Sequence, residues 1–253
     1  MSVQYESLKG KTALVTGGSR GIGRACCRML AASGVSVVVH YNKSREAASE
    51  VVHKIRNESG IALAVQADLG DASSIKTLIQ KSQQELGHLD ILVNNAGEMT
   101  RASLTELTDE LWDHSMDLHL KAVYRLSKAV VPTMMENGWG RIINISSQSV
   151  YVGSNKHAHY VAAKAGLLGL SYSLVKELGN HGITVNLVSP GRILTDLLIP
   201  HVPTRKDEWL KMTPLGRFGE PEEVASAVVF LASGEASYIS GANIHVNGGV
   251  VMG

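Results

Sequence analysis

The sequence has few cysteines, no surplus of charge of either sign and no long apolar run. Its 253 residues include 2 Cys, 6 Pro and 5% aromatic residues, with 24 Lys+Arg against 23 Asp+Glu. The balanced charge argues against a nucleic-acid partner. The first nine residues are polar, and no apolar run approaches the roughly 20 residues that cross a bilayer. We therefore expect a cytoplasmic protein that binds neither nucleic acid nor a membrane.

The two cysteines, Cys26 and Cys27, are adjacent within a predicted helix. Neighbouring side chains on a helix point about 100° apart, so a bridge between them would be strained. We expect free thiols in or near the core. The histidines are scattered apart from His157 and His159, and no Cys/His spacing suits zinc. The sequence therefore predicts no metal site.

Apolar runs rich in β-branched residues alternate with helical stretches along the whole chain. The runs are apolar throughout, which is typical of parallel strands covered on both faces. We predict one domain over residues 1–253, an α/β doubly wound Rossmann-like fold that binds NAD(P), with a seven-stranded, mainly parallel sheet and helices on both faces. The expected strands are residues 12–16, 35–40, 61–66, 89–94, 140–146, 183–189 and 243–246.

The helical stretches have recognisable ends. Asp71 and Thr108 are expected N-caps, whereas Gly34, Gly60 and Gly87 lie where C-terminal caps are expected. Residues 190–219 form the one long stretch that we expect to be irregular. Such a stretch in a compact domain is usually functional, so we interpret it as a substrate-binding lid.

A glycine-rich segment follows the first predicted strand and opens the first helix. It reads Thr16-Gly17-Gly18-Ser19-Arg20-Gly21-Ile22-Gly23. Glycine lets the backbone turn tightly and approach a pyrophosphate, whose charge the free N–H groups and dipole of a helix start favour. The position between two strands predicts a dinucleotide site. The residues expected to bind the cofactor here are Gly17, Ser19, Arg20, Gly21, Ile22 and Gly23.

The end of the second strand indicates which dinucleotide binds. An acidic residue there would hold the ribose 2′-hydroxyl of NAD, but the segment reads His40-Tyr41-Asn42-Lys43-Ser44-Arg45 and has no carboxylate. Arg20 and the polar residues of this segment could bind a 2′-phosphate. The alternative for Lys43 and Arg45 is that they are solvated charges at a helix start. We expect NADP(H) in preference to NAD(H), with Tyr41 and Asn42 in the site.

Two further strand ends fit the same site. Asp68, followed by Leu69, could accept a hydrogen bond from the adenine amino group, with a helix N-cap as the alternative. Asn94-Asn95-Ala96-Gly97 ends the fourth strand, and its small residues would let a cofactor pass close to the backbone. The residues added to the cofactor site are Asp68, Leu69, Asn94, Ala96 and Gly97.

A tyrosine followed four residues later by a lysine occurs repeatedly. The pairs are Tyr5/Lys9, Tyr124/Lys128, Tyr160/Lys164 and Tyr172/Lys176. Only Tyr160/Lys164 follows a strand that ends in serines, at residues 142–147. Tyr172 lies 12 residues beyond Tyr160, about 120° around the helix, and cannot share its site. We interpret the pairs at Tyr124 and Tyr172 as surface or interface pairs.

With these segments together, the chain resembles the classical short-chain dehydrogenases/reductases over nearly its whole length. The motifs in the family's order are the glycine turn, Asn94-Asn95-Ala96-Gly97, Ser147, Tyr160-Val161-Ala162-Ala163-Lys164 and Pro190-Gly191. The chain is most similar to the 3-oxoacyl-(acyl carrier protein) reductase type, through residues 140–143, 182–186 and 241–249. The resemblance implies an oxidoreductase that interconverts a ketone and a secondary alcohol, assembled as a homotetramer or homodimer.

The family's catalytic residues map onto Ser147, Tyr160 and Lys164. Reduction of a carbonyl builds negative charge on its oxygen, so the site needs a proton donor, Tyr160, and a hydrogen bond, from Ser147. An ammonium one turn along the helix, that of Lys164, favours the phenolate. By the resemblance, Lys164 also holds the nicotinamide ribose. The cofactor-binding residues are completed by Tyr160, Lys164, Pro190, Gly191, Ile193 and Thr195.

His119 stands where the family usually has an asparagine. By the resemblance, the backbone carbonyl at this position holds a water that feeds a proton relay to the lysine. In one interpretation the backbone does this work and the imidazole is only tolerated. In the other, the imidazole joins the relay and adds a titration near neutrality. We include His119 among the candidate catalytic residues.

The motifs do not define the substrate. Residues 148–159 are expected to line the pocket with the lid, and they are more polar and bulky than a slot for plain acyl chains would be. Family arginines that would face an acyl carrier are replaced by Gly138 and His181. A sugar or polar alcohol is the alternative substrate, and a catalytically weak NADP(H)-binding scaffold or sensor is the alternative function. The candidate substrate contacts are Ser147 and four residues that are equally well rim residues facing water, Tyr151, His157, His159 and Arg192.

Overall fold

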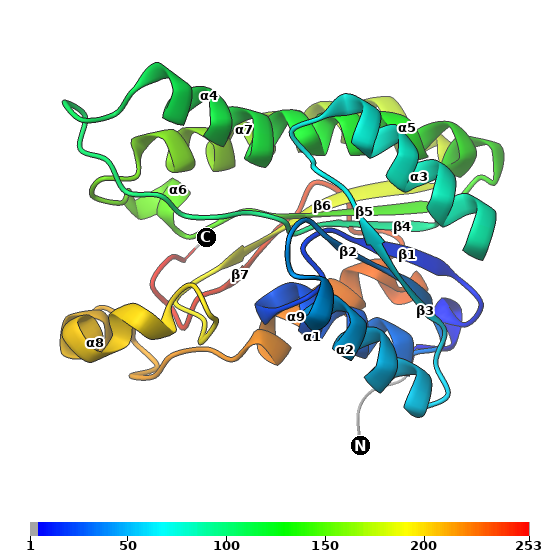
Figure 1. Ribbon diagram of the computed structural model, residues 1–253, viewed down its shortest axis with the longest axis horizontal. Helices are drawn as coiled ribbons and strands as arrows, with labels where there is room; N and C mark the ends of the chain where they lie inside the picture. Colours follow the sequence, from blue (N-terminus) through cyan, green and yellow to red (C-terminus); the bar gives the residue numbers. More distant parts are fainter. Residues whose placement is uncertain (1–4, 253) are drawn as a thin grey trace.

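The computed structural model describes residues 5–252, which form a parallel sheet between two layers of helices (Figure 1). The seven strands lie in the order β3-β2-β1-β4-β5-β6-β7, and every neighbouring pair is parallel. The predicted strands are confirmed to within two residues at their ends. They are β1 (Thr12–Val15), β2 (Ser36–Tyr41), β3 (Ala62–Gln66), β4 (Ile91–Asn94), β5 (Gly140–Ile145), β6 (Ile183–Pro190) and β7 (Asn243–Val246).

Helices cover both faces of the sheet. Figure 1 shows α1, α2 and α9 on one side and α3, α4, α5 and α7 on the other. Within residues 5–252, no helix combines the length and the apolar character needed to cross a membrane. The helices are α1 (Gly21–Ala32), α2 (Arg45–Asn57), α3 (Ala72–Leu86), α4 (Asp109–Met116), the π-helical turn η2 (Asp117–Lys121), α5 (Ala122–Glu136), α6 (Ser149–Val152), α7 (Ala158–Leu178), α8 (Val202–Lys211) and α9 (Pro221–Ala232).

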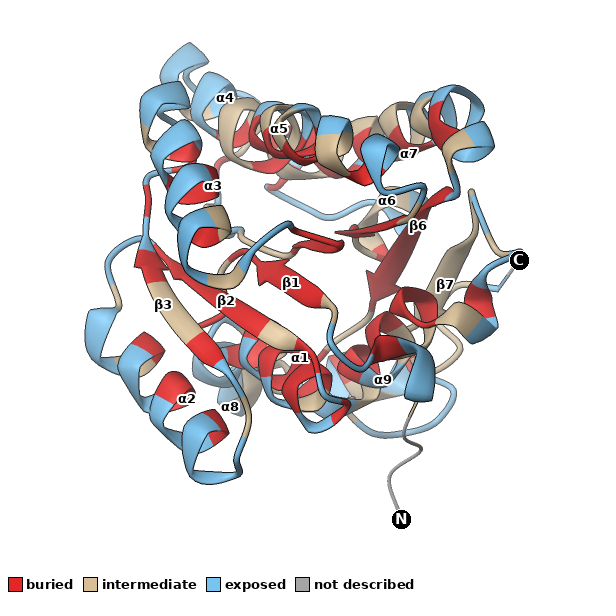
Figure 2. Cartoon of the chain, turned by 90° about the vertical axis from the view of Figure 1, so that its right-hand side faces the viewer, coloured by how far each residue is buried: buried red, intermediate tan, exposed pale blue. Residues whose placement is uncertain are grey.

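The central strands are buried on both sides, as their continuous apolar runs predict (Figure 2). Every residue of β1, β4, β5 and β6 is buried, whereas β7 at the edge is only partly buried. One apolar cluster joins the sheet to α1, α2 and α9, and a second joins it to α3, α5 and α7. Removing this apolar surface from water stabilises the fold and holds the strand ends in fixed relative positions.

The helix ends mostly follow the sequence signals. Asp71 accepts hydrogen bonds from the backbone of Ser73 and Ser74, and Thr108 caps α4, so both N-caps are confirmed. Gly60 takes part in the C-terminal cap of α2, because its N–H donates to Ile55 O at 2.9 Å, although the left-handed residue there is Ser59, with φ +64°. A Cβ on Gly60 would lie 2.7 Å from Ile55 Cγ2, so close packing also favours glycine.

Residues 190–219 are more ordered than the sequence suggested. They contain a 3₁₀ turn (Ile199–His201) and α8, and prolines occupy the first turns of both, where a backbone N–H is not needed. Backbone hydrogen bonds join the two ends of the segment, from Leu194 N to Gly219 O at 2.8 Å and from Gly219 N to Arg192 O at 3.0 Å. The predicted lid is therefore a tied flap with its own helix, placed after the carboxyl end of β6.

The two cysteines are free and fully buried in the core, as expected. Burial raises the pKa of Cys26 to about 12 and that of Cys27 well above its ordinary value. Neither thiol is therefore reactive as a thiolate at neutral pH. Among residues 5–252, no group of three or more His, Cys, Asp and Glu side chains is arranged to hold a metal ion.

Candidate active site

The predicted site residues gather at the carboxyl edge of the sheet. The strand order turns in opposite directions from β1 and β4, and ligands of open parallel sheets bind at such a point. The glycine turn follows β1, Asn95 follows β4, Ser147 lies just beyond β5, and Gly191 follows β6. Four parallel strands thus bring together residues that are more than 170 positions apart in the sequence.

Thr16 joins the glycine turn to the end of β4. Its hydroxyl donates to Val93 O at 3.3 Å and accepts from the backbone N of Asn95 at 2.9 Å and of Ala96 at 3.0 Å. The Asn95 amide in turn donates to Thr16 O at 2.9 Å and to Gly17 O at 3.2 Å. Sequence analysis gave Thr16 no role. Its place at a strand end, directly before the glycines, is the signal that could have indicated it.

Two glycines of the turn have no room for a side chain. A Cβ on Gly23 would lie 2.2 Å from Gly17 O, and one on Gly17, where φ is +62°, would lie 3.0 Å from Ala96 Cα. The start of α1 is therefore bare backbone, which suits close contact with a pyrophosphate. Arg20, the residue before α1, is exposed, and its side chain does not cap the helix. These residues fit a dinucleotide phosphate.

His40 holds the turn from the opposite side. Its Nδ1 accepts from Gly17 N at 3.0 Å, and its Nε2 lies 3.1 Å from Ala67 O. Burial lowers the pKa of His40 to about 4, so the neutral ring accepts at Nδ1 and donates from Nε2. Sequence analysis missed this role, because nothing in the local pattern shows which backbone groups a buried imidazole meets. The ring fixes the glycine turn against the ends of β2 and β3.

The adenosine end of the predicted site contains exposed polar groups. Asp68 Oδ1 accepts from Gly70 N at 2.9 Å, and the N-cap alternative for Asp68 is wrong because Asp71 caps α3. Its role toward adenine stays a prediction. Tyr41 is buried, whereas Asn42 and Lys43 are exposed at the end of β2. This strand end therefore presents amide and ammonium groups rather than a carboxylate.

The remaining predicted cofactor residues either lie in the segment after β6 or have side chains inside the sheet and the core. The methyl carbon of Thr195 lies 3.1 Å from the position of a Cβ on Gly21, so the segment after β6 reaches the glycine turn. Ile193 is buried, and a Cβ on Gly191 would lie 2.6 Å from Asn247 Cα. In contrast, the Asn94 amide donates to the Asn144 side chain at 2.8 Å inside the sheet. Leu69 lies in the apolar cluster beneath α3.

Helix α7 brings Tyr160 and Lys164 to Ser147 beyond the end of β5. Lys164 Nζ donates to Ile145 O at 2.6 Å and lies 5.9 Å from the centroid of the Tyr160 ring. Ser147 Oγ accepts from Ser149 Oγ at 2.8 Å and from Ser149 N at 3.2 Å, which leaves its own hydrogen available to donate. The structure therefore assembles the predicted trio.

Burial governs the protonation of both groups. It lowers the pKa of Lys164 to about 8 and raises the pKa of Tyr160, with the Ser147 hydroxyl partly offsetting that rise. The pKa of Tyr160 is raised rather than lowered, because burial of the phenol outweighs the groups that favour the phenolate. A phenol that stays protonated at neutral pH is suited to donate a proton.

His119 lies buried against Tyr160 and Gly97. The centroids of the His119 and Tyr160 rings are 5.1 Å apart, edge to face at 88°, and a Cβ on Gly97 would lie 2.7 Å from His119 Cε1. Burial and the charge of Lys164 lower the pKa of His119 to about 3, so the predicted titration near neutrality is wrong. Its Nδ1 has no hydrogen-bond partner within residues 5–252. The imidazole is thus a neutral polar group beside the phenol.

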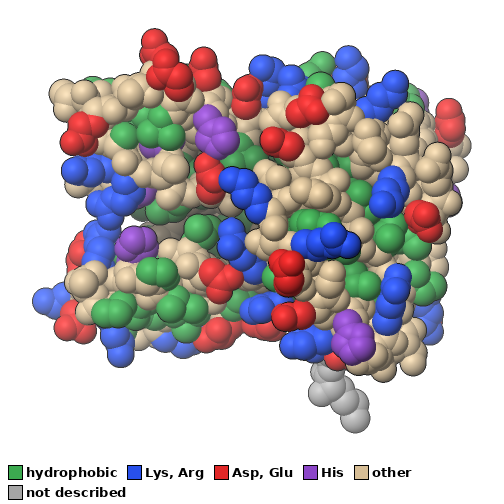
Figure 3. All heavy atoms as spheres, in the orientation of Figure 1, with side chains coloured by type: hydrophobic (Ala, Val, Ile, Leu, Met, Phe, Trp, Pro, Cys, Tyr) green, Lys and Arg blue, Asp and Glu red, His purple; other side chains and the backbone are tan. Residues whose placement is uncertain are grey.

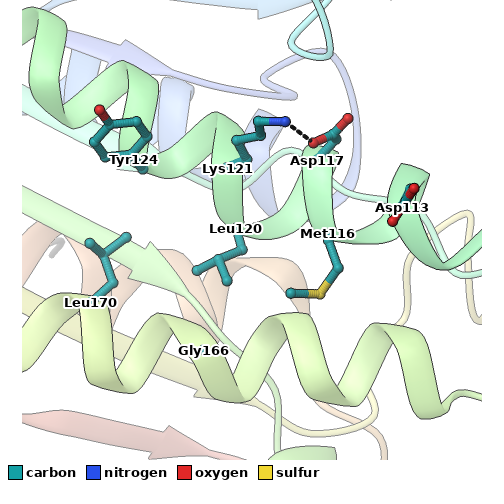
Figure 4. Close-up of a pocket in the computed structure, with 8 residues that line it drawn as sticks. All are labelled: Asp113, Met116, Asp117, Leu120, Lys121, Tyr124, Gly166 and Leu170. Carbon is teal, nitrogen blue, oxygen red and sulfur yellow. Dashed lines mark ion pairs between the residues drawn. The ribbon is translucent and has the colours of Figure 1, made fainter.

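The outer face of the π-helical turn that carries His119 lines a groove of about 610 Å³ (Figure 4). Leu120 packs against α7 at Gly166, where a Cβ would lie 2.7 Å from Leu120 Cδ2. This close approach sets the position of the turn, and therefore of His119, against α7. The groove itself is on the outer helices, apart from Tyr160. It is lined by Asp113, Met116, Asp117, Leu120, Lys121, Tyr124, Gly166 and Leu170.

The candidate substrate residues behave differently from one another. The Tyr151 hydroxyl accepts from Asn243 Nδ2 at 2.5 Å, and its ring centroid lies 4.9 Å from that of His245. Tyr151 is thereby engaged with β7 rather than with Tyr160. As an exposed side chain, it fits the rim interpretation.

The two predicted histidines are buried rather than at a wet rim. His157 Nδ1 lies 2.9 Å from Ser154 Oγ, and His159 Nε2 lies 3.0 Å from Thr100 Oγ1. Arg192 Cζ lies 5.4 Å from the ring centroid of Trp209 on α8. Sequence analysis missed Trp209 and the neighbouring Arg205, although their four-residue spacing would have placed them on one helix face.

Comparison with known proteins places this geometry in a family. The family model described as enoyl-(acyl carrier protein) reductase matches residues 17–251. The chain is 43% identical to the 3-oxoacyl-(acyl-carrier-protein) reductase FabG of Staphylococcus aureus strain Mu50, over 96% of this chain and 98% of that one. It is 44% identical to FabG of Escherichia coli strain K12, over 97% and 99%. The crystal structure of the angucycline C-6 ketoreductase LanV with bound NADP matches with a TM-score of 0.92 at 36% identity, covering 99% of this chain and 100% of that one.

Replacing Thr16 tests whether its hydroxyl joins the turn to β4. Thr16→Val keeps the shape but leaves the backbone N–H groups of Asn95 and Ala96 without an acceptor, so we expect the free energy of unfolding to fall by about 1–3 kcal/mol. Thr16→Ser keeps the hydroxyl and should stay within about 1 kcal/mol of the native protein. Urea unfolding at one protein concentration measures both. Equal losses in the two variants would show that the methyl group matters instead.

Proposed function

Because the chain belongs to the short-chain dehydrogenase/reductase family, we propose that it is an NADP(H)-dependent oxidoreductase that interconverts a ketone and a secondary alcohol. The observation that carries the proposal is the placement of Ser147, Tyr160 and Lys164 at the same carboxyl edge of the sheet as a closely packed glycine turn. A catalytically weak scaffold or sensor is disfavoured, since binding alone would not need the Ser147 hydroxyl or a proton donor at Tyr160.

The chain's own residues handle the proton. The cofactor would supply the hydride. Tyr160 donates the proton to the carbonyl oxygen as its negative charge develops, and Ser147 donates a hydrogen bond to the same oxygen. Lys164, whose pKa burial lowers to about 8, is largely an ammonium at neutral pH. It therefore stabilises the phenolate that remains on Tyr160 after proton transfer.

His119 acts in this proposal as a positioning residue. Its neutral ring packs edge-on against Tyr160 and restricts the orientation of the phenol. The backbone relay implied by the resemblance does not require the imidazole to change its charge. The structure therefore favours the interpretation in which histidine replaces asparagine without adding a titrating group.

The cofactor would be held by the residues that line the carboxyl edge of the sheet. The glycine turn suits the pyrophosphate, and Arg20 with Asn42 and Lys43 suits a 2′-phosphate. The NADP bound in the ketoreductase LanV supports NADP(H) as the preferred cofactor. NAD(H) is the alternative. The segments involved are residues 17–23, 41–42, 68–69, 94–97 and 190–195, together with Tyr160 and Lys164.

The names of the relatives favour a 3-oxoacyl-like ketone as substrate, because the two FabG proteins are 3-oxoacyl reductases. The replacement of expected carrier-facing arginines by Gly138 and His181 weakens the case for an acyl carrier protein. The polar segment 148–159 suits a sugar or another polar alcohol better than it suits a plain acyl chain. The ketone-to-alcohol chemistry is common to all these substrates.

The outer groove supports self-association as part of the proposal. Tyr124 on α5 and Tyr172 on α7 are 46% and 48% exposed, and apolar side chains of both helices border the groove (Figure 4). Large exposed apolar side chains on neighbouring helices favour a protein interface. We expect a homotetramer, or a homodimer, that buries this face about a two-fold axis.

Tyr160→Phe tests the proton donor. The variant retains the ring that packs on His119 but lacks the hydroxyl, so we expect ketone reduction to fall by at least about 100-fold. NADPH binding, measured by fluorescence titration, should change little. Tyr172→Phe, on the exposed side of the same helix, is the matched control and should retain full activity. Native-like turnover by Tyr160→Phe would refute the assignment.

Cofactor choice can be tested at Arg20. We expect kcat/KM to be higher with NADPH than with NADH. Arg20→Ala should lower the value for NADPH by about 10-fold and leave that for NADH within about 2-fold, because only NADPH carries the 2′-phosphate. Arg24→Ala removes an exposed arginine one turn further along α1 and should change neither. A native preference for NADH would contradict the proposal.

Sedimentation velocity tests the proposed assembly. Tyr124→Glu places a charge in the expected interface without disturbing the core, so it should shift the native oligomer toward smaller species. Leu104→Glu, at a side chain that is 82% exposed and outside the groove, should sediment as the native protein does. A native monomer at micromolar concentration would rule the assembly out.

A further inference from the structure

Several basic side chains lie near the segments that carry Ser147 and Tyr160, because Gln148 N donates to Pro190 O at 3.0 Å, two residues before Arg192. Arg101 follows β4, Arg192 follows β6 and Arg205 lies on α8. Arg101 and Arg205 both lower the pKa of His157, though burial lowers it more, so their charges are close to this ring. Figure 3 shows Lys and Arg side chains along the rim of a hollow on this side of the molecule. Such a rim attracts an anionic ligand.

Arg192 is the basic group whose hydrogen bonds are least satisfied. Arg192 Cζ and Arg205 Cζ lie 5.4 Å and 4.9 Å from the same Trp209 ring. Glu208 accepts from Arg205 at 2.7 Å and 3.0 Å, which occupies both its oxygens. Arg192 Nη1 is buried without a hydrogen-bond partner among the described residues. The carboxylate nearest to the pair is thus committed to Arg205.

His157 offers a second unpaired nitrogen. Its Nδ1 lies 2.9 Å from Ser154 Oγ, and its Nε2 is buried without a partner within residues 5–252. In the tautomer in which Ser154 Oγ donates to Nδ1, the ring carries its hydrogen on Nε2, and this is the tautomer that the inference uses. Because a buried donor without an acceptor is unfavourable, both His157 and Arg192 favour a ligand that supplies acceptor oxygens.

The nearby carboxylates of Glu106 and Glu208 form their hydrogen bonds with residues other than Arg192 and His157. Glu106 accepts from Ser103 Oγ and Ser103 N within its own loop, and the charge of Lys156 further lowers its pKa. The backbone of Ala102 donates to Lys156 O at 3.0 Å, which ties the loop of Arg101 to the segment of His157. Arg192 Nη1 and His157 Nε2 therefore remain without an acidic hydrogen-bond partner among the described residues.

Arg192 starts from a fixed backbone position. Gly219 N donates to Arg192 O at 3.0 Å, and Gly191 N donates to Val246 O at 2.8 Å. A Cβ on Gly191 would collide with the Asn247 backbone, so this junction of flap and sheet has little freedom. The backbone of Arg192 is thereby held at a set place relative to the end of β6.

We propose that the substrate is an oxo acid whose carboxylate binds Arg192, with His157 Nε2 as a second donor, while its ketone lies at Tyr160 and Ser147. The inference rests on the proposed function and narrows its substrate class. Guanidinium and carboxylate match in bidentate geometry, which orients a small substrate as well as attracting it. The carboxylate is unchanged in the reaction, since the hydride and the proton both go to the ketone.

Matched substrate pairs test the proposal. We would compare NADPH oxidation with 4-oxopentanoate and its methyl ester, and with 3-oxobutanoate and its methyl ester, because each pair differs in charge but shares its ketone. Native kcat/KM should be at least about 10-fold higher for the acids. Arg192→Gln should lower the acid values by about 10- to 100-fold and leave the ester values within about 3-fold. Lys206→Gln, which removes one positive charge from exposed α8 surface, should keep the native preference.

Binding affinities test the carboxylate site even if the native protein reduces these ketones slowly. The acids and esters would be titrated calorimetrically into the Tyr160→Phe protein saturated with NADP⁺, with and without Arg192→Gln. Tighter binding of the acid that disappears with Arg192→Gln supports the proposal. Equal affinities for acid and ester, or acid binding unchanged by Arg192→Gln, would overturn it. Tighter binding of dihydroxyacetone phosphate than of either acid would assign the site to phosphate instead.

The two proposals fail in different ways. Reduction of the esters without any preference for the acids leaves the oxidoreductase function standing and removes the oxo-acid assignment. If the acids bind more tightly than the esters but none of these ketones supports NADPH oxidation, the carboxylate site stands and the oxidoreductase function is removed.

Discussion

The close approach of two backbone segments, the turn after β1 and the end of β4, is the constraint on which the site depends. A Cβ on Gly17 would lie 3.0 Å from Ala96 Cα, and the Thr16 hydroxyl joins both segments through hydrogen bonds from the backbone of Asn95 and Ala96. The two strands at the switch of strand order are therefore locked together. Their shared edge presents backbone rather than side chains, and this is why a dinucleotide fits there.

The reacting groups are positioned from the same edge. Gly97, two residues beyond Asn95, leaves space that the His119 ring fills, and His119 packs edge-on against Tyr160. Leu120, the next residue, sits over Gly166 on α7. A series of close contacts therefore runs from the glycine turn to the phenol, and at each glycine along it a larger residue would force the segments apart. Burial in these contacts also raises the pKa of Tyr160 and lowers that of Lys164.

Much of this could be predicted from the sequence, since the apolar runs and the caps at Asp71 and Thr108 reflect local physical requirements. The helix α8 could not. Its sequence is polar, and its buried residue, Trp209, packs on distant partners, Phe218 and Arg192. The direction of the Tyr160 pKa shift was also wrong, because one turn of helix predicts the lysine neighbour but not how far both groups are withdrawn from water. The titration expected of His119 failed for the same reason.

The sequence by itself determined the parallel sheet, the glycine turn and the order of Ser147, Tyr160 and Lys164, because apolar periodicity and motif spacing are local properties of the chain. Only the tertiary structure decided which polar groups would be satisfied. It joined Thr16 to β4, brought the Tyr151 hydroxyl to Asn243 of β7, and left Arg192 and His157 with unpaired nitrogens among the described residues. The physical reason is that a hydrogen bond needs its partner within about 3 Å, and for these groups folding brings the partners from segments far apart in the sequence or fails to supply one.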